Sequence, residues 1–562
     1  MKTGRAGLLG VLVLTSMMIG NPARAQDRTQ ARSVVMTRYG IVAAESPLAA
    51  QAGVTILARG GSAVDAAVAT NAVMGVVEPM MNGIGGDLFV IVYDAKSGKL
   101  FGLNASGWAP AGLSIENLNK KGVTSMPEHG IDTVTVPGIV DGWSKLLSRF
   151  GRKDFKEVLA PAIHYAQEGF PVPELAAAYW QWEDYLRGDA NAARTFLPSG
   201  RAPRIGEIFT NPDLAWSLKQ IAASGRDAFY RGEIAQRILA YSQRLGGTMT
   251  AADLADYASE WVEPISTTYH AWTVYEIPPN GQGIAALDML NLMEQFPLSQ
   301  FGFHSPDAFH VMIEAKKLAY ADLRRYIGDP KFSKIPVQGL LSKNYASDRA
   351  KKIDMAKANC DVAPGEPLPT TGDTTYLSVV DRDGNMVSLI QSNFSEFGSG
   401  LVADGTGFAL HNRGALFTLD RASPDVLAGH KRPLHTIIPA FMAKGDERIA
   451  FGIMGGFNQA QAHAQFVSNI VDYQMNIQAA LEAPRFTKHT FSGCDVDMED
   501  RIPENVRAAL ESRGHKIKVF GSFSSQVGGG QAVRRDFSKG LNFGASDPRK
   551  DGEAIPEPVP DH

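Results

Sequence analysis

Cysteine is scarce in this sequence, and neither sign of charge is in large excess. Only two of the 562 residues are cysteine, Cys360 and Cys494, which excludes a thiolate zinc cluster because such a cluster needs three or four cysteine ligands. These two residues can form at most one disulfide, and the sequence leaves open whether they do. The 55 Lys and Arg against 59 Asp and Glu give a net charge of −4, which argues against nucleic acid as a partner.

Long apolar runs are confined to the N-terminus. An uncharged, mainly apolar stretch at residues 7–20 follows Lys2 and Arg5 and precedes the small-residue pattern Ala23-Arg24-Ala25, as in a secretory signal peptide. The stretch is shorter than the roughly 20 residues that span a bilayer, which disfavours the alternative of a membrane anchor. We therefore predict a signal peptide at residues 1–25, a periplasmic or secreted mature chain, and no attachment to a membrane once the signal is removed.

Motifs for common cofactors are also missing. The chain has no G-x-x-x-x-G-K-[ST], G-x-S-x-G or H-E-x-x-H pattern, which disfavours a P-loop, an α/β-hydrolase and a zincin-type metal site. Gly405-Thr-Gly407 lacks the third glycine of a dinucleotide loop. The acidic residues between 495 and 500 fit a solvated loop better than a cation site. The sequence thus predicts a protein with neither metal nor cofactor.

Glycine, by contrast, is abundant, and its 56 residues are typical of strand-rich folds with many tight turns. Residues 42–75 are small and apolar and predict two Ala-rich helices joined by Gly60-Gly61, with Ser62 as N-cap of the second. Residues 140–330 have a helical pattern, and the chain becomes β-rich after the Pro/Gly-rich loop 360–373. Runs of strands beside runs of helices predict an α+β fold, with sheets inside and helical layers outside.

The individual elements follow from the spacing of apolar residues. Strands are expected at 88–93, 99–104, 374–380, 386–391, 407–410, 437–442, 449–453, 516–520 and 531–535, the last two as a pair. Helices are expected at 155–169, 211–223, 232–245, 306–326, 459–473 and 477–483. The tail at 553–562 carries three prolines and is expected to be disordered.

A pair of threonines, Thr374-Thr375, stands where the loop 360–373 meets a β-rich segment. A hydroxyl is a weak nucleophile without a base beside it, and an N-terminal α-amine can serve as that base. The pKa of such an amine, about 7.7–8, leaves a large part of it neutral near pH 7. A cut between Asp373 and Thr374 would therefore place nucleophile and base in one residue. The simpler interpretation of Thr374 is a residue that merely favours a strand.

Motifs along the chain resemble the gamma-glutamyltransferase family. The segment Asp373–Asp381 is similar to the family's processing site. Further similar motifs extend over nearly the whole mature chain: Gly60–Ala67, Asn82–Asp87, Thr135–Gly138, Ile277–Pro279, Glu314–Asp322 with Gly328–Pro330, Gly398–Gly400, Arg432–Pro439, Met454–Gly456 and Asp547–Gly552. Each motif is short, but their number and order make the resemblance specific.

The resemblance implies an N-terminal-nucleophile hydrolase, whose αββα sandwich is formed jointly by two autoprocessed subunits. In such a proenzyme Thr374 attacks the carbonyl group of Asp373, and the chain separates into a large subunit, residues 26–373, and a small subunit, residues 374–562, which stay together. The mature Thr374 then attacks a small-molecule amide and forms an acyl-enzyme.

Three further residues match functional positions of the family. Gly455 and Gly456 match its oxyanion pair, and glycine suits this task because its N–H can approach an oxyanion without hindrance from a side chain. Ser392 matches a hydroxyl that contacts the nucleophile. Otherwise the two glycines would form a turn before a helix, and Ser392 would be an ordinary strand residue.

The substrate pocket departs from the family pattern. Ser106 stands where the family has an arginine that binds an α-carboxylate. Leu416 and Arg413 replace the carboxylate and the amide that hold the α-amine, and His435 and Thr436 replace two serines. A zwitterionic glutamyl group would therefore lose charged partners. Arg413 can instead bind a substrate carboxylate from the other side, or form a structural salt bridge.

The segment Leu416–Lys431 is short where the family often carries a longer lid, which predicts an open site. These departures resemble a divergent subgroup that includes oxamate amidohydrolase and cephalosporin-acylase-like proteins. We expect an enzyme that hydrolyses γ-glutamyl or related acyl amides such as glutathione; transfer of the acyl group to an acceptor amine is the alternative, which an open site disfavours because water competes. One alternative is an oxamate- or cephalosporin-acylase-like amidohydrolase of the same fold, and another is a non-catalytic periplasmic binding protein. Thr374, Gly455 and Gly456 are all present and weigh against the binding protein.

Overall fold

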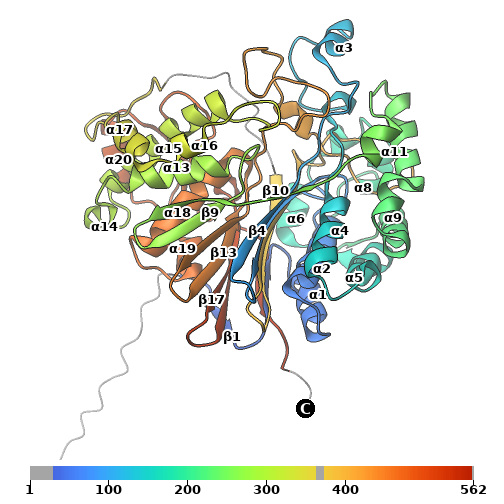
Figure 1. The fold of residues 1–562 in the computed structure, drawn as a ribbon, viewed down its shortest axis with the longest axis horizontal. Coiled ribbons are helices and arrows are strands. Elements are labelled where there is room, and N and C mark those ends of the chain that lie inside the picture. Colours follow the sequence, from blue (N-terminus) through green and yellow to red (C-terminus); the bar gives the residue numbers. More distant parts are fainter. Residues whose placement is uncertain (1–29, 363–372, 560–562) are drawn as a thin grey trace, which may run out of the picture.

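Two seven-stranded antiparallel sheets lie face to face at the centre of the computed structural model, which describes residues 30–362 and 373–559. Helices cover the outer face of each sheet (Figure 1). This arrangement confirms the predicted α+β fold with an αββα order of layers. The predicted signal peptide lies outside the described residues.

The first sheet carries the predicted nucleophile. Its strand order is β19 (Glu553–Pro556), β2 (Ile41–Ala44), β10 (Asp373–Val380), β11 (Met386–Phe394), β3 (Asp87–Asp94), β4 (Lys99–Ala105) and β7 (Glu260–Val262). Strand β10 therefore lies inside the sheet, paired with β2 on one side and β11 on the other. A hairpin turn joins β10 to β11, and Gly384 provides its left-handed residue with φ of +85°.

The second sheet packs against the first through apolar side chains. Its order is β1 (Val35–Thr37), β18 (Leu541–Ser546), β17 (Gly530–Asp536), β13 (Glu447–Ile453), β12 (Ala440–Lys444), β9 (Trp272–Glu276) and β8 (Ile265–Tyr269). Residues such as Phe89, Tyr376 and Phe441 fill the space between the two sheets. Two smaller sheets lie outside the sandwich: β14 (Phe486–Thr487), β15 (Asp495–Glu499) and β16 (Lys516–Phe520), and β5 (Phe170–Pro171) with β6 (Ile208–Phe209).

The helices form one layer on each sheet. The layer on the first sheet contains α1 (Pro47–Ala58), α2 (Ala63–Val77), α4 (Ile139–Phe150), α5 (Phe155–Glu168), α9 (Pro212–Ser224) and α11 (Glu233–Arg244). The layer on the second contains α13 (Gly283–Met293), α15 (Pro306–Tyr326), α18 (Gln459–Val471) and α19 (Ile477–Glu482), with α17 (Lys343–Ala350) and α20 (Glu504–Ser512) outside. Shorter helices connect these: α3 (Ile115–Lys120), α6 (Glu174–Tyr179), α7 (Glu183–Leu186), α8 (Ala190–Phe196), α10 (Arg226–Tyr230), α12 (Ala251–Ala255), α14 (Leu298–Phe301) and α16 (Val337–Leu340). None of the helices in the described ranges is long and apolar enough to span a membrane.

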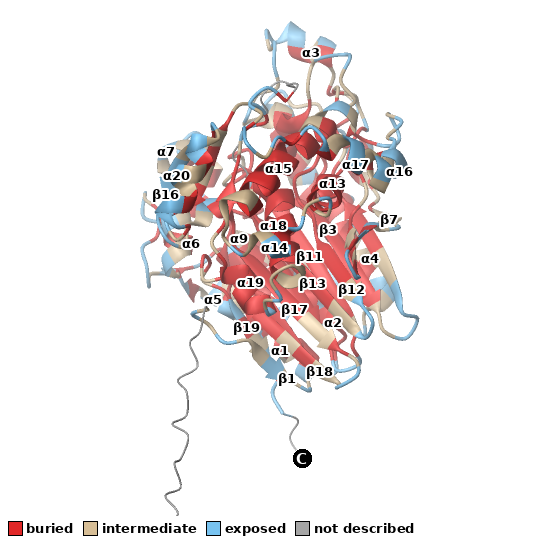
Figure 2. Ribbon diagram, turned by 90° about the vertical axis from the view of Figure 1, so that its left-hand side faces the viewer, coloured by how far each residue is buried: buried red, intermediate tan, exposed pale blue. Residues whose placement is uncertain are grey.

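The predicted Ala-rich helix pair is α1 and α2. Ser62 caps α2 through a capping box with Asp65, in which each side chain accepts a hydrogen bond from the other residue's N–H. Every residue of α2 is buried, and small side chains let α1 approach it closely. A Cβ atom on Gly53 of α1 would lie 2.2 Å from Thr70 Oγ1 of α2, so this crossing requires glycine. Burial is highest in the sheets and inner helices (Figure 2).

Most of the remaining expected elements are confirmed within a few residues, but four predictions are wrong. Residues 407–410 form no strand, because Gly405 and Gly407 have left-handed φ values and Asn211 binds the Gly407 carbonyl oxygen. Residues 516–520 and 531–535 are strands of different sheets and do not pair with each other. The acidic segment is strand β15 rather than a solvated loop, and its Glu499 is held by Arg549. Residues 553–556 are not disordered but form edge strand β19, where a proline costs no ladder hydrogen bond.

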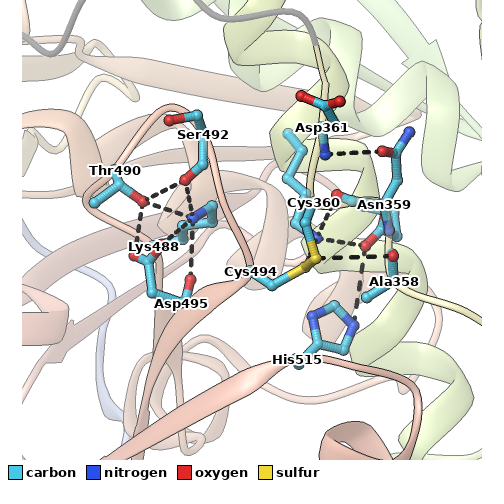
Figure 3. Close-up of a disulfide and its surroundings, with 12 residues drawn as sticks. Ala358, Asn359, Cys360, Asp361, Lys488, Thr490, Ser492, Cys494, Asp495 and His515 are labelled. Atoms are coloured by element: carbon cyan, nitrogen blue, oxygen red, sulfur yellow. Dashed lines mark hydrogen bonds and ion pairs between the residues drawn. A yellow bond between two sulfur atoms is a disulfide. The ribbon is translucent and has the colours of Figure 1, made fainter.

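The sequence leaves open whether the two cysteines pair, and in the structure they form a disulfide (Figure 3). Cys360 lies in the segment after α17, and Cys494 directly precedes β15. The residues around them are also joined by hydrogen bonds, since Gly493 N–H donates to the Cys360 carbonyl oxygen.

Candidate active site

Thr374 is held where the pairing of β10 with β11 is irregular. Asp373 pairs with Phe394 and Thr375 pairs with Gln391, so Thr374 alone faces two residues of β11. Bulges of this kind often occur beside active sites because they redirect a side chain. The Thr374 hydroxyl donates to Ser392 Oγ at 3.3 Å and accepts from Gln459 Nε2 at 3.4 Å. Ser392 thus contacts Thr374, as the family resemblance implies.

The two predicted oxyanion glycines lie between β13 and α18. Gly455 and Gly456 have φ values of +121° and +57°, which suit glycine, and they lead into the first turn of α18. Gln282 Nε2 donates to the Gly456 carbonyl oxygen at 2.8 Å and so fixes the orientation of this loop. Helix α18 begins with Gln459, the residue that contacts Thr374. The glycine pair and the threonine therefore meet at the positive end of a helix, which favours an oxyanion.

A buried charge cluster lies two strands away from Thr374, because β11 stands between β10 and β3. Asp87, the first residue of β3, pairs in register with Ser392 of β11. Its Oδ2 atom lies 2.8 Å from His435 Nε2, 3.1 Å from His411 Nδ1 and 3.4 Å from Arg413 Nε. The Arg413 Nη1 group donates to Thr436 Oγ1 at 2.7 Å. The structure therefore brings three predicted pocket residues together around a carboxylate that the sequence did not single out.

Arg413 combines both roles considered for it. It is fully buried and forms a salt bridge with Asp87, which is the structural interpretation. Its Nη2 group, however, has no hydrogen-bond partner among the described residues. Its guanidinium lies over the ring of Phe394, 4.6 Å from the centroid, and Phe394 has a strained φ of +80°. A buried cation with an unused donor group can bind a substrate carboxylate.

The pKa values in this cluster reflect burial and neighbouring charge. Burial alone raises the pKa of Asp87, but its interactions with His411 and His435, hydrogen bonds among them, outweigh burial and hold the pKa well below its usual range. Burial lowers the pKa of Arg413 to about 10, against the opposing effect of Asp87. Burial and the charge of Arg413 lower the pKa of His435 to about 3. His435 is therefore neutral at pH 7 and donates its Nε2–H to the ionised Asp87.

Ser106 lies in a separate network of amides. Its hydroxyl donates to Asn104 Oδ1 at 2.7 Å and accepts from Asn280 Nδ2 at 3.3 Å. The adjacent Gly107 N–H donates to Asp87 Oδ1 at 2.8 Å, which links this network to the charge cluster. Ser106 is buried and has no hydrogen bond to Arg413 among those of the described side chains.

The prediction of an open site concerns the cleaved enzyme and stays a prediction, because the structure describes an uncut chain. Thr374 is only 1 % exposed, and Arg413 and His435 are completely buried.

Asp87, His411, Gln282 and Gln459 were not predicted from the sequence as site residues. Asp87 ends the motif Asn82–Asp87, and Gln459 follows Gly456 by three residues. The sequence therefore gives the positions of both residues but not the residues that they contact. Asp87 and Arg413 are 326 residues apart in the chain, and Gln459 and Thr374 are 85 apart. Only the folded chain shows that they meet.

A possible metal site lies away from this region. His310, Glu314 and His515 offer ligand atoms within 4.8 Å of one another. Lys317 Nζ donates to Glu314 Oε1 at 2.7 Å, however, and so already places a cation beside this carboxylate. His310 Nδ1 and His515 Nε2 are hydrogen-bonded at 2.9 Å, and burial lowers the pKa of both rings. The cluster is therefore better described as a closed hydrogen-bond network than as a metal centre.

Comparison with known proteins decides the family. A sequence profile described as Gamma-glutamyltranspeptidase matches residues 49–557. This chain belongs to the gamma-glutamyltranspeptidase family. As a member of that family it is a proenzyme of the N-terminal-nucleophile type, a threonine amidohydrolase that processes itself.

Relatives within the gamma-glutamyltranspeptidase family carry different names. The chain is 37% identical over 530 residues to the glutathione hydrolase-like YwrD proenzyme of Bacillus subtilis. This alignment covers 93% of this chain and 99% of that protein. It is 34% identical over 531 residues to the oxamate amidohydrolase proenzyme of Klebsiella pneumoniae, covering 92% and 98% of the two chains. Its fold is similar to the crystal structure of cephalosporin acylase from Bacillus halodurans, with a TM-score of 0.88, 43% identity and coverage of 96% and 99%.

The stability of the protein should depend on pH through His435. Its pKa is about 3 in the folded chain against about 6.5 when unfolded, so between these values the unfolded state binds a proton that the folded state does not. The contribution of His435 to stability is therefore full above pH 6.5 and is lost as the pH falls toward 3, by up to about 1.4 kcal/mol per pH unit.

We expect His435→Gln to make the free energy of unfolding fall less steeply between pH 6 and pH 4, as measured by urea titration. Glutamine keeps an N–H donor for Asp87 but does not titrate. His164→Gln, at an exposed position, is the matched control and should leave the slope as in the wild type. An unchanged slope in His435→Gln would show that His435 is not a neutral buried group.

Proposed function

We propose that this family member is exported after loss of residues 1–25 and cleaves itself between Asp373 and Thr374. The Thr374 hydroxyl attacks the Asp373 carbonyl carbon, the peptide C–N bond breaks, and an ester links the two parts. Water hydrolyses the ester, which leaves residues 26–373 with a new carboxyl end and residues 374–562 with a free amine on Thr374. The contact of Thr374 with Ser392, on a bulge between paired strands, supports this assignment.

In the mature enzyme the same oxygen attacks a substrate amide. The α-amine of Thr374 takes the hydroxyl proton, the oxygen bonds the carbonyl carbon, and the oxyanion meets the N–H groups of Gly455 and Gly456. The proton then passes to the departing amine, and an acyl-enzyme remains. Water hydrolyses this ester with the α-amine again as base, so the proposed reaction is amide hydrolysis without metal or cofactor.

We further propose that the acyl group carries a carboxylate and no α-ammonium group. The observation that supports this most is the unused Nη2 donor of buried Arg413, beside Phe394 of the neighbouring strand β11. An α-ammonium would need an anionic partner, but Leu416 is fully buried among apolar side chains, and Asp87 is already engaged by Arg413 and two histidines. A dicarboxylic monoamide or an oxamate fits this charge pattern. A relative named oxamate amidohydrolase agrees with it.

Glutathione and other γ-glutamyl amides are the second candidate substrates. Several relatives that align over more than nine-tenths of this chain are named glutathione hydrolases or glutathione hydrolase-like. A γ-glutamyl substrate would have to place its α-ammonium against groups other than the apolar side chain of Leu416. The proposal therefore keeps the chain in a divergent subgroup that does not act on γ-glutamyl amides.

Self-cleavage can be tested directly. The purified wild type should give two fragments on a denaturing gel run with reductant, which is needed because Cys360 and Cys494 are joined. Thr374→Ala should remain one chain and lose amide hydrolysis by more than roughly 10³-fold. The neighbouring Thr375→Ser is the matched control and should still be cleaved. A single uncut chain that nevertheless hydrolyses amides would contradict the proposal, and an intact chain without activity would support a binding protein.

Substrate choice can be tested with three p-nitroanilides of similar size. We expect kcat/KM to be at least about tenfold higher for the glutaryl than for the γ-glutamyl anilide, because the α-ammonium of the latter is desolvated without a partner. Arg413→Met should lower kcat/KM for the glutaryl anilide by roughly 30-fold or more but change it little for the uncharged butyryl anilide. Release of ammonia from oxamate tests the smaller acyl group. Equal effects of Arg413→Met on both anilides would show that Arg413 does not bind the carboxylate.

A further inference from the structure

Gln459 contacts the proposed nucleophile but has no role in the mechanism described so far. It is completely buried at the start of α18. Its Oε1 atom accepts the backbone N–H of Ile438 at 3.0 Å, and only an oxygen can accept that bond. The amide nitrogen must therefore face Thr374, where Nε2 lies 3.4 Å from Oγ1. Gln459 can only donate to this oxygen and so cannot act as a base.

We propose that Gln459 is a catalytic residue that stabilises Thr374 Oγ1 whenever this oxygen carries negative charge. The inference rests on Thr374 being the nucleophile. Charge develops on Oγ1 as its proton leaves for the α-amine, and again when the C–Oγ1 bond of the acyl-enzyme breaks. A fixed N–H donor lowers the energy of both states more than that of the neutral hydroxyl. The long contact of the uncut chain shortens as charge develops on the oxygen.

The test compares two glutamines of the same helix. Gln465, like Gln459, is buried in α18 and accepts a backbone N–H through Oε1, here from Phe486, but its Nε2 bonds only to backbone oxygens of Gln461 and Phe486. We expect Gln459→Leu to lower kcat or the rate of self-cleavage roughly 10- to 100-fold with little change in KM. Gln465→Leu should lower the thermal midpoint without this kinetic loss.

Gln459→Glu adds a second measurement that a structural role would not affect. Its carboxylate would raise the pKa of the nearby α-amine, so the acidic limb of the kcat/KM profile should move to higher pH. If Gln459→Leu and Gln465→Leu have the same kinetics and Gln459→Glu leaves the pH profile unchanged, Gln459 is structural only. A wild type that hydrolyses no amide would instead contradict the proposed function itself.

The disulfide supports a second, independent inference. Cys360 precedes the proposed cleavage point by 13 residues and Cys494 follows it, so the bond joins the two proposed subunits. The chain contains no other cysteine, and therefore this is the only disulfide that can link them. Cys360 is exposed, whereas Cys494 is 3 % exposed and lies 3.7 Å from Lys317 Nζ.

The surroundings of the disulfide hold both cysteines in place. Lys317 of α15 donates to the Asn359 carbonyl oxygen at 2.9 Å, next to Cys360. On the other side Lys488 donates to Ser492 O and Asp495 Oδ1, both at 2.9 Å, and so fixes the loop that contains Cys494 (Figure 3). The bond therefore joins two segments that are already ordered by their own subunits.

We infer that the mature enzyme is a covalent heterodimer, an inference that rests on cleavage at Thr374. With the disulfide intact, the two cleaved chains unfold as one molecule, and their stability does not depend on protein concentration. Without it, unfolding releases two separate chains, so dilution favours the unfolded state by mass action. In an uncut chain the same bond only closes a loop within one polypeptide.

Four proteins test this inference: the wild type, Cys494→Ser, Thr374→Ala, and the double variant. On a denaturing gel without reductant the wild type should run as one species and separate into two only after reduction, whereas Cys494→Ser should show two fragments in both lanes. Over a 100-fold dilution, the urea midpoint should fall for Cys494→Ser but stay constant for the wild type and for both uncut variants.

Fragments that separate without reductant in the wild type would overturn the covalent link. A wild type that stays one chain even after reduction would instead show that cleavage does not occur, which contradicts the proposed function and not the disulfide. If Cys494→Ser fails to fold, the wild type with and without reductant on the gel still decides between these outcomes.

Discussion

Pairing of β10 on both of its sides is the constraint on which the site depends. Backbone hydrogen bonds to β11 along the strand and to β2 over Leu377–Val380 hold β10, and Thr374 lies beside Ser392 of β11. The bulge in β11 then turns Thr374 toward Gln459. As the proposed nucleophile, Thr374 serves in two reactions, first on its own chain and then on a substrate, and a fixed position benefits both.

Charge in the pocket is organised around a single buried carboxylate. Asp87 binds Arg413 and two histidines, and its own partner Gly107 N–H ties it to the end of β4. Arg413 is a buried cation with one carboxylate partner and an unused donor, so it attracts a further anion. Removing either Arg413 or Asp87 alone would leave the other charge buried and unpaired, which is costly. Under the proposed function, this pocket selects substrates by charge, while Thr374 and the two glycines supply the reaction.

The sequence predicts the layers of the fold and the position of Thr374, because alternating apolar residues and the ordered motifs are local features. The Ala-rich helices and the β10–β11 hairpin follow from such patterns. The strand expected at 407–410 fails because left-handed glycines and the side chain of Asn211 override the apolar pattern. The roles of Asp87 and Gln459 depend on contacts between residues far apart in the chain, and neither periodicity nor composition carries that information.

The order of strands in the two sheets determines when the chain can be cut. Strand β2, from the part before Thr374, lies between β19 and β10, which both come after it, while β1 from the first part completes the edge beside β18. The two proposed subunits are thus interwoven and share each sheet. Neither has a complete sheet of its own, so the whole polypeptide has to fold before the proposed cut divides it, and the order of these events cannot be reversed.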